Sequence, residues 1–339
     1  MMPIGTPIFI CGHPKSGTTL LATLLDDHSQ LTVFPEETFY LDMLNGSPQR
    51  TPGEGMEWLL QEGACRYLSM DIVQNELRGD SDYSDFDFET FQKSFGHHFD
   101  TGPQTHARVF EALMAAYAHV TSQTGKRYWV EKTPGTERYL RQLKTWYPDL
   151  RAIYIVRDPR DVYASYARKK ERESEGQRQL SVEEFVARWS RSVWEWRRYS
   201  AQDANTLTVR YEDLLRYPQQ ILSLVCGFLG VEYETVLETP TKIGKPWSGN
   251  SMHGDRFSSI STTPIGRWKN LLAPNQLYML ETYLGKAMIM FGYQPVHGPQ
   301  PLHKAIRLWL QQSTRRRRVL GMLIRLYWPF QLPKRLTRD

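Results

Sequence analysis

The first residues with a clear chemical use form a loop, Gly-His-Pro-Lys-Ser-Gly-Thr-Thr at residues 12–19. It follows a short apolar run and precedes a segment with leucines at helical spacing. The two glycines let the backbone approach a ligand closely, and the amide groups that open the next helix attract negative charge. The lysine and three hydroxyl groups complete an anion-binding site. A plain glycine-rich turn is the alternative, but it requires none of these side chains.

The position of the lysine distinguishes between phosphate-containing ligands. In the loop that binds nucleoside triphosphates, the lysine directly follows the last glycine. Here Lys15 comes before Gly17, and no acidic strand end suited to Mg²⁺ is evident. A P-loop kinase or NTPase is therefore the weaker alternative.

The same loop resembles the 5′-phosphosulfate loop of sulfotransferases that use 3′-phosphoadenosine 5′-phosphosulfate (PAPS). Residues 154–165 resemble the family's 3′-phosphate motif, in which a strand-end arginine and a serine on the next helix, here Arg157 and Ser165, hold the 3′-phosphate. A guanidinium group suits this role because it binds phosphate oxygens in pairs and stays charged. The resemblance implies PAPS as cofactor, 3′,5′-ADP as product and no metal. The cofactor-binding residues that it implies in the loop are Pro14, Lys15, Ser16, Gly17, Thr18 and Thr19.

Three further segments are similar to family motifs and follow the family's order. Lys132 stands in a strand-end lysine motif, Tyr211 in an Arg-Tyr-Glu-Asp signature, and Arg267 and Trp268 in the loop that closes over the nucleotide. The resemblance extends from residue 8 to about residue 293, and the pattern is that of the branch with tyrosylprotein and heparan-type sulfotransferases. The Gly-Arg-Trp sequence departs from the Arg-Lys-Gly of the small-molecule branch, which disfavours a phenol or steroid acceptor.

The resemblance also implies a glutamate general base, either Glu36 or Glu37. Counting from the first motif favours Glu36, whereas the local Glu-Thr match favours Glu37, so both stay open. A solvated turn is the structural alternative for this acidic pair. In the implied mechanism, the acceptor hydroxyl or amine gives its proton to the glutamate as it attacks sulfur in line. Lys15 and Lys132 would neutralise charge on the sulfuryl and bridging oxygens.

Alternating apolar runs and amphipathic segments predict the elements that position these residues. The predicted strands are residues 7–11, 128–131, 151–156 and 207–209, and the predicted helices are residues 105–123, 136–146, 161–170, 181–201, 218–229 and 274–291. This alternation specifies an α/β fold, with a P-loop-like central parallel sheet flanked by helices. Residues 41–104 predict a mostly helical insertion of short helices and loops, and residues 243–266 a C-terminal lid loop. Asn250 and Ser251 in that loop are candidates for binding the sulfuryl group.

The composition is that of one enzyme-sized domain with an extension. With 40% hydrophobic and 23% charged residues, the chain is ordinary for a globular protein. We expect a single domain over residues 1–300 and a basic, partly amphipathic extension over residues 301–339. Cys11, Cys65 and Cys226 lack the spacing of a disulfide framework or metal site. No basic region leads into a long apolar stretch near the N-terminus, so we expect a cytoplasmic protein.

The extension carries much of the net charge of +5, including four arginines at residues 315–318, and apolar residues follow at spacings of three and four. One interpretation is peripheral contact with the inner membrane face, and another is a solvated or docked tail. A non-catalytic anion-binding protein is the alternative from another class. The body lacks interleaved basic and aromatic residues, so no specific nucleic acid is expected. The resemblance implies an acceptor among small molecules, glycans, lipids and peptides.

Overall fold

The computed structural model describes residues 5–73, 81–172, 180–249 and 260–298. Asn250, Ser251 and the extension 301–339, with its arginine run, lie outside the described residues.

A five-stranded parallel sheet forms the centre of the described chain, in the order β2-β5-β1-β6-β7. Its strands are β1 (Thr6–Cys11), β2 (Leu31–Val33), β5 (Tyr128–Lys132), β6 (Arg151–Val156) and β7 (Thr206–Arg210). Ile10 of β1 is in register with Lys132 of β5 and with Ile153 of β6. The loops that follow these strands therefore meet at one edge, where open α/β sheets bind their ligands. The predicted P-loop-like parallel sheet is confirmed.

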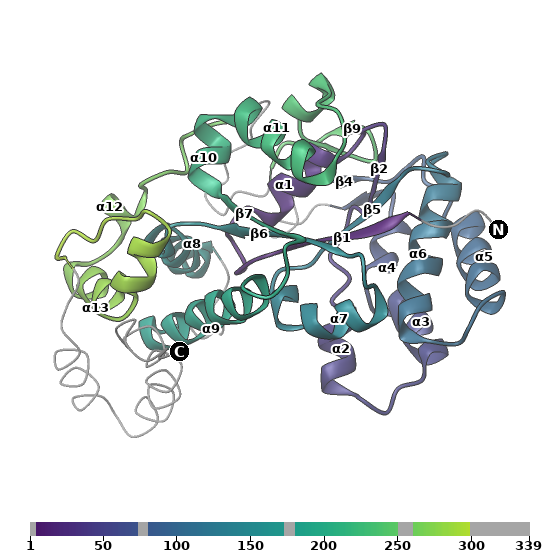
Figure 1. Ribbon diagram of the computed structural model, residues 1–339, viewed down its shortest axis with the longest axis horizontal. Coiled ribbons are helices and arrows are strands. Elements are labelled where there is room, and N and C mark those ends of the chain that lie inside the picture. The colour runs from purple at the N-terminus through teal and green to yellow at the C-terminus, as the bar shows by residue number, and fades with distance from the viewer. Residues whose placement is uncertain (1–4, 74–80, 173–179, 250–259, 299–339) are drawn as a thin grey trace, which may run out of the picture.

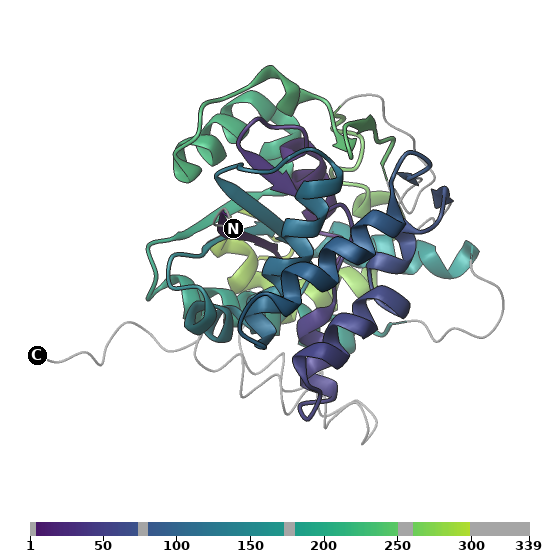
Figure 2. The ribbon, with the colours of Figure 1, turned by 90° about the vertical axis from the view of Figure 1, so that its right-hand side faces the viewer.

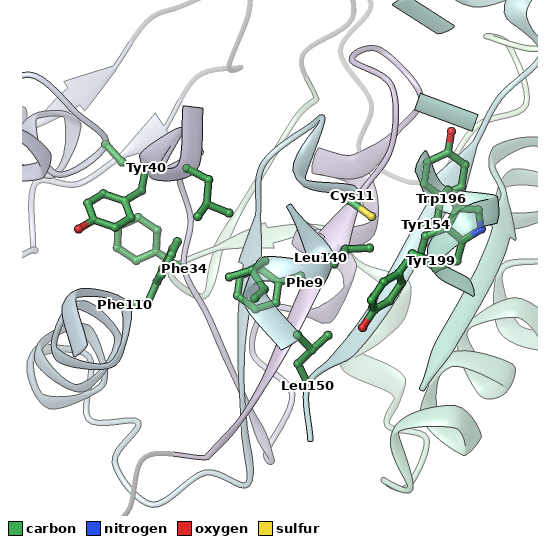
Figure 3. Packing of buried hydrophobic residues seen from close by; sticks show 14 of the residues in the cluster. Phe9, Cys11, Phe34, Tyr40, Phe110, Leu140, Leu150, Tyr154, Trp196 and Tyr199 are labelled. Atoms are coloured by element: carbon green, nitrogen blue, oxygen red, sulfur yellow. The ribbon is translucent and has the colours of Figure 1, made fainter. Parts of the chain in front are cut away.

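Helices cover both faces of this sheet, as Figure 1 shows. Along β1, Ile8 and Ile10 face α1 (Thr18–Leu25), α10 (Tyr211–Arg216) and α11 (Pro218–Leu229), whereas Phe9 and Cys11 belong to the core on the other face. In that second core, the ring of Tyr154 stacks on Trp196 with centroids 5.0 Å apart (Figure 3). Burial on both faces explains why the strands appear in the sequence as continuous apolar runs.

A mostly helical insertion separates β2 from β5, and it lies in front of the sheet in Figure 2. The predicted mostly helical insertion is confirmed, and one of its helices is 13 residues long. Phe91, Phe95 and Phe99 repeat every four residues and bury one face of that helix, a period that the prediction missed. The elements are α2 (Tyr40–Gly46), α3 (Pro52–Gln61), α4 (Cys65–Leu68), β3 (Ile72–Val73), β4 (Ser81–Asp82), α5 (Phe88–Asp100) and α6 (His106–Val120).

The second half of the chain matches most predicted helices but differs in several places. The helix predicted over 136–146 is a 3₁₀ turn followed by α7, separated at Tyr139. The short helix α10 was not predicted, and a two-stranded hairpin occupies the start of the predicted lid loop. The remaining elements are η1 (Thr136–Arg138), α7 (Leu140–Trp146), α8 (Pro159–Arg172), α9 (Val182–Ser200), η2 (Thr235–Glu238), β8 (Thr241–Lys242), β9 (Lys245–Pro246), α12 (Trp268–Leu271) and α13 (Pro274–Met290).

Two further findings bear on the chain's environment. All three cysteines are buried and free. Within the described ranges, no helix combines the length and the apolar character needed to cross a membrane.

Candidate active site

The loop between β1 and α1 has a backbone that requires glycine at two positions. Gly12 and Gly17 have φ values of 146° and 99°, and Lys15 between them is also left-handed at 72°. A Cβ atom on Gly12 would lie 2.4 Å from the carbonyl oxygen of Ile155, and one on Gly17 would lie 2.3 Å from the ring of Tyr211. The loop therefore lies directly against β6 and α10, and only glycine allows this approach.

The first turn of α1 presents polar groups that fit an anion. Among the described residues, no side chain caps the helix at Gly17, and leading amide groups of this kind suit an anionic ligand. Ser16 is buried, and its Oγ atom has no hydrogen-bond partner within the described part of the chain. A buried hydroxyl without a partner is unfavourable unless a ligand completes its bonding. Thr18 and Thr19 are buried in the same turn, and Pro14 is exposed.

Arg157, the residue after β6, joins the loop to the C-terminal part of the chain. Its guanidinium donates to the carbonyl oxygens of Lys15 at 3.1 Å and Pro264 at 3.0 Å, and it lies over the ring of Tyr211 at 4.6 Å. Its Nε atom is buried and, among the described residues, has no partner. An arginine so placed could still donate to a phosphate oxygen.

The predicted nucleotide-closing segment is docked on the start of α8. The Asp161 carboxylate accepts from the backbone N–H groups of Gly266 at 2.7 Å and Trp268 at 2.9 Å. Burial raises the pKa of Asp161, and these bonds together with the charge of Arg157 oppose that rise. Ser165 lies one turn further along α8 and donates its hydroxyl to the carbonyl oxygen of Asp161 at 2.9 Å. The 3′-phosphate motif and the closing segment are therefore adjacent.

A buried lysine links the phosphate loop to one of the two candidate glutamates. Lys132, at the end of β5, is 3% exposed, and its Nζ atom donates to Thr19 Oγ1 at 3.1 Å and to Glu37 Oε1 at 2.8 Å. The side chain of Glu37 is 21% exposed. The structure thus brings together a loop hydroxyl, a cation and an accessible carboxylate at the carboxyl edge of the sheet.

The other candidate glutamate has different surroundings. The side chain of Glu36 is only 2% exposed, and its Oε1 atom accepts from the Tyr83 hydroxyl at 2.6 Å and from Lys242 Nζ at 3.0 Å. Sequence reasoning missed both partners. Tyr83 stands among the polar residues of the insertion, and Lys242 lies just before the predicted lid loop, in no predicted element, so neither has a periodic or motif signal.

The segment that carries both glutamates is fixed to the end of β5. Thr133 Oγ1 accepts from the backbone N–H of Thr38 at 3.0 Å, and the Thr38 hydroxyl donates to Glu131 at 2.7 Å. Burial raises the pKa of Glu131. These contacts hold residues 36–38 at a constant distance from Lys132.

The predicted site residues therefore fall into two groups. The donor group surrounds the β1–α1 loop and the start of α8, and the catalytic group surrounds Lys132. Arg267 is half-buried in the docked segment, where its Nε atom donates to the carbonyl oxygen of Thr263 at 3.0 Å. Ser251 is outside the described residues. The donor group comprises Pro14, Lys15, Ser16, Gly17, Thr18, Thr19, Arg157, Ser165, Tyr211, Arg267 and Trp268.

Comparison with known proteins relates this arrangement to sulfotransferases. Residues 7–235 match the Sulfotransferase family. Nodulation protein NoeE of Sinorhizobium fredii is 29% identical over 166 residues, which cover 48% of this chain and 31% of NoeE. Protein-tyrosine sulfotransferase 2 of Gallus gallus is 23% identical over 304 residues, which cover 86% of this chain and 70% of that protein.

A solved structure has the same fold. The sulfotransferase domain from the curacin biosynthetic pathway superposes with a TM-score of 0.53 at 22% identity, covering 87% of this chain and 99% of that domain. The family match includes the β1–α1 loop, both glutamates, Lys132, Arg157 and Tyr211. By its sequence over residues 7–235, the chain belongs to the Sulfotransferase family.

Proposed function

We propose that this protein transfers the sulfuryl group of PAPS to an acceptor hydroxyl or amine by in-line displacement, with Glu37 as the general base. The observation that supports this most is the position of Lys132 Nζ, within hydrogen-bond distance of both Thr19 of the phosphate loop and Glu37. The Lys132 ammonium group therefore lies between Thr19, on the side expected for the leaving group, and Glu37, on the side expected for the acceptor. An in-line reaction requires such an arrangement.

The donor group presents polar and charged groups that suit PAPS. The open amide groups of α1 and the Ser16 hydroxyl suit the 5′-phosphosulfate, and the Arg157 Nε atom and Ser165 suit the 3′-phosphate. Tyr211 and Trp268 flank the same region and could contact the nucleotide. The fit of these residues supports PAPS as cofactor and 3′,5′-ADP as product.

The two glutamates differ in the property that a general base requires. A base must reach the acceptor proton. Glu37 is partly exposed, whereas Glu36 is buried beneath Tyr83 and Lys242. We therefore assign the proton transfer to Glu37.

PAPS supplies the activated sulfuryl group, whose bond to the 5′-phosphate oxygen breaks as a new bond forms from sulfur to the acceptor. Glu37 takes the proton that the acceptor loses. Lys15 and Lys132 stabilise the charge that develops on the sulfuryl and leaving oxygens. The products are the sulfated acceptor and 3′,5′-ADP.

The acceptor class must be determined by experiment. Similarity to protein-tyrosine sulfotransferase 2 makes tyrosine peptides one arm of a screen with labelled PAPS, with glycans, lipids and small hydroxyl or amine compounds as the others. We expect 3′,5′-ADP to raise the melting temperature, because a ligand that binds only the folded state stabilises it. Glu37→Gln should keep that stabilisation and lose about 10²- to 10⁴-fold in turnover.

The opposite results are equally defined. If saturating 3′,5′-ADP leaves the melting temperature unchanged while ATP with Mg²⁺ raises it and is hydrolysed, the protein is a nucleotide-dependent kinase or NTPase instead. If Glu37→Gln turns over as fast as wild type, another group accepts the proton.

A further inference from the structure

A second buried ion pair lies directly beside the candidate catalytic pair. Lys242 donates to Glu36 at 3.0 Å and to Ser81 Oγ at 2.9 Å, and Tyr83 donates to the same Glu36 oxygen. The partners are far apart in the sequence, by 47 residues for Tyr83 and by 206 for Lys242. Removing one partner from a buried pair is strongly unfavourable, so this contact fixes three segments relative to one another.

The hairpin that carries Lys242 has a strained turn. Its two central residues, Ile243 and Gly244, have φ values of 52° and 67°, as in the tight turn that joins two-residue hairpins. A β-branched residue in this left-handed region is unusual and strained. Such a conformation persists only where surrounding contacts hold it.

Those contacts come from the helix that follows the phosphate loop. Asp26, at the C-terminal end of α1, accepts from the Thr241 hydroxyl and from the backbone N–H of Gly244, both at 3.0 Å. The turn is therefore clamped to α1, and Lys242 has a fixed position relative to the loop that is expected to bind the donor.

The two lysines of the site share one space. Lys132 and Lys242 both line a small cavity together with Thr19, Asp26 and Thr241. Their carboxylate partners, Glu37 and Glu36, are neighbours in the chain, so a displacement of Glu36 moves the backbone of Glu37. The hairpin, the insertion and the donor loop thus meet at one pair of adjacent acids.

We propose that Glu36 and Lys242 are positioning residues whose ion pair sets the place of Glu37 and Lys132, and that the β8–β9 hairpin exists in this chain to deliver Lys242. The proposal rests on the proposed function, since it assumes Glu37 as the base. In this proposal, Glu36 neither accepts nor donates a proton during the reaction. Positioning requires that neither charge be left buried without its partner.

The experiment compares Lys242→Met, Glu36→Gln and the double variant with wild type. These substitutions conserve size, and the double variant removes both charges, which avoids an unpaired buried charge. The control is Lys245→Met in the same hairpin, whose partly exposed amine pairs with Asp82 and Asp85. Three quantities are measured for each variant: the rate of 3′,5′-ADP release from PAPS, the affinity for 3′,5′-ADP by calorimetry, and the melting temperature. The release rate is measured with water alone and with the panel of acceptors.

We expect each single variant to lose about 10²-fold in kcat, the effect of misplacing catalytic groups by about 1 Å. The affinity for 3′,5′-ADP should stay within about twofold, because the donor contacts are unchanged. The double variant should recover about tenfold relative to the single variants, since it leaves no unpaired buried charge to displace the segment. Lys245→Met should resemble wild type.

Two results would overturn the proposal. Glu36 is the base if Glu36→Gln and the double variant are equally inactive while Lys242→Met keeps its turnover. The pair is only structural if all three variants keep wild-type kcat per folded molecule and differ in melting temperature alone. If the single variants do not fold, the double variant alone tests the proposal. A loss of kcat beyond about 10³-fold would indicate that Glu36 is the base. A kcat within about tenfold of wild type would support the positioning role. Failure of wild type to bind 3′,5′-ADP would instead contradict the proposed function.

Discussion

Lys15 and Arg157 meet at one carbonyl group, and we expect them to have different roles. The Lys15 carbonyl oxygen accepts from Arg157 at 3.1 Å, so the two residues belong to one continuous surface. Lys15 belongs to the loop expected to face the 5′-phosphosulfate, where bonds change. Arg157 belongs to the motif for the 3′-phosphate, which does not react. A contact made equally in the ground state and the transition state affects binding, and one that strengthens in the transition state affects turnover.

Lys15→Ala should therefore chiefly lower kcat, by about 10²- to 10³-fold, because it removes stabilisation of developing charge. Arg157→Ala should chiefly weaken 3′,5′-ADP binding, by about 10- to 100-fold, as expected when a charged hydrogen bond is lost. Calorimetry with 3′,5′-ADP and kinetics at saturating PAPS separate the two effects. Equal and small effects of both substitutions on both quantities would place the donor elsewhere.

The sequence marks the proposed donor residues more clearly than the proposed catalytic ones, for a physical reason. A loop that wraps a phosphate uses consecutive residues, so Gly12 to Thr19 can be found as a motif. A general base is defined by its exposure and partners, which come from distant segments. Glu36 and Glu37 are indistinguishable in the sequence, and only Tyr83 and Lys242, which no motif marks, separate the buried acid from the accessible one.

At the scale of elements, the hairpin β8–β9 depends on the end of α1. Burial raises the pKa of Asp26 from 3.8 to about 6, although its hydrogen bonds from Gly244 and Thr241 oppose the rise. The folded protein thus binds this proton more tightly than the unfolded chain. Between pH of about 4 and 6, the free energy of unfolding should fall as pH rises, because only the unfolded state releases the proton there.

Asp26→Asn should remove this dependence and keep an oxygen that accepts from Thr241 and Gly244. The difference in free energy of unfolding between variant and wild type should therefore shift in favour of the variant as the pH rises from about 4 to about 7. The shift should be at most on the order of 3 kcal/mol. Denaturant unfolding at the two pH values measures the difference, with the exposed neighbour Asp27→Asn as control. A difference between variant and wild type that is the same at both pH values would contradict the assignment.

The elements themselves followed from periodicity, and the misses have local causes. Strands buried on both faces and helices with one apolar face have clear patterns, which is why β6, α9 and α11 were predicted within one residue or so. Residues 136–146 have a helical pattern, but Gly135 in a left-handed conformation first opens a 3₁₀ turn. The β8–β9 hairpin has two residues in each strand, too few for a period of two to be recognised.

At the scale of the whole molecule, charge is divided unevenly along the chain. Residues 301–339 contain ten Lys and Arg against one Asp, a net charge of +9, so residues 1–300 carry a net charge of −4. The entire positive balance therefore belongs to the extension. An anionic surface would attract the basic segment electrostatically and would repel the acidic remainder of the chain.

We therefore expect the extension to bind anionic membranes, with the arginines at 315–318 contributing about 1 kcal/mol each near the surface. The full chain should co-sediment with vesicles of phosphatidylglycerol and phosphatidylcholine, less at high salt, and should ignore phosphatidylcholine alone. A chain ending at Gln312 should lose this binding and keep its stabilisation by 3′,5′-ADP, because the donor residues all precede residue 270. Equal sedimentation of the two chains, or none by either, would mean that the extension has another use, such as docking on the domain. Loss of 3′,5′-ADP stabilisation on truncation would show that the extension is part of the domain.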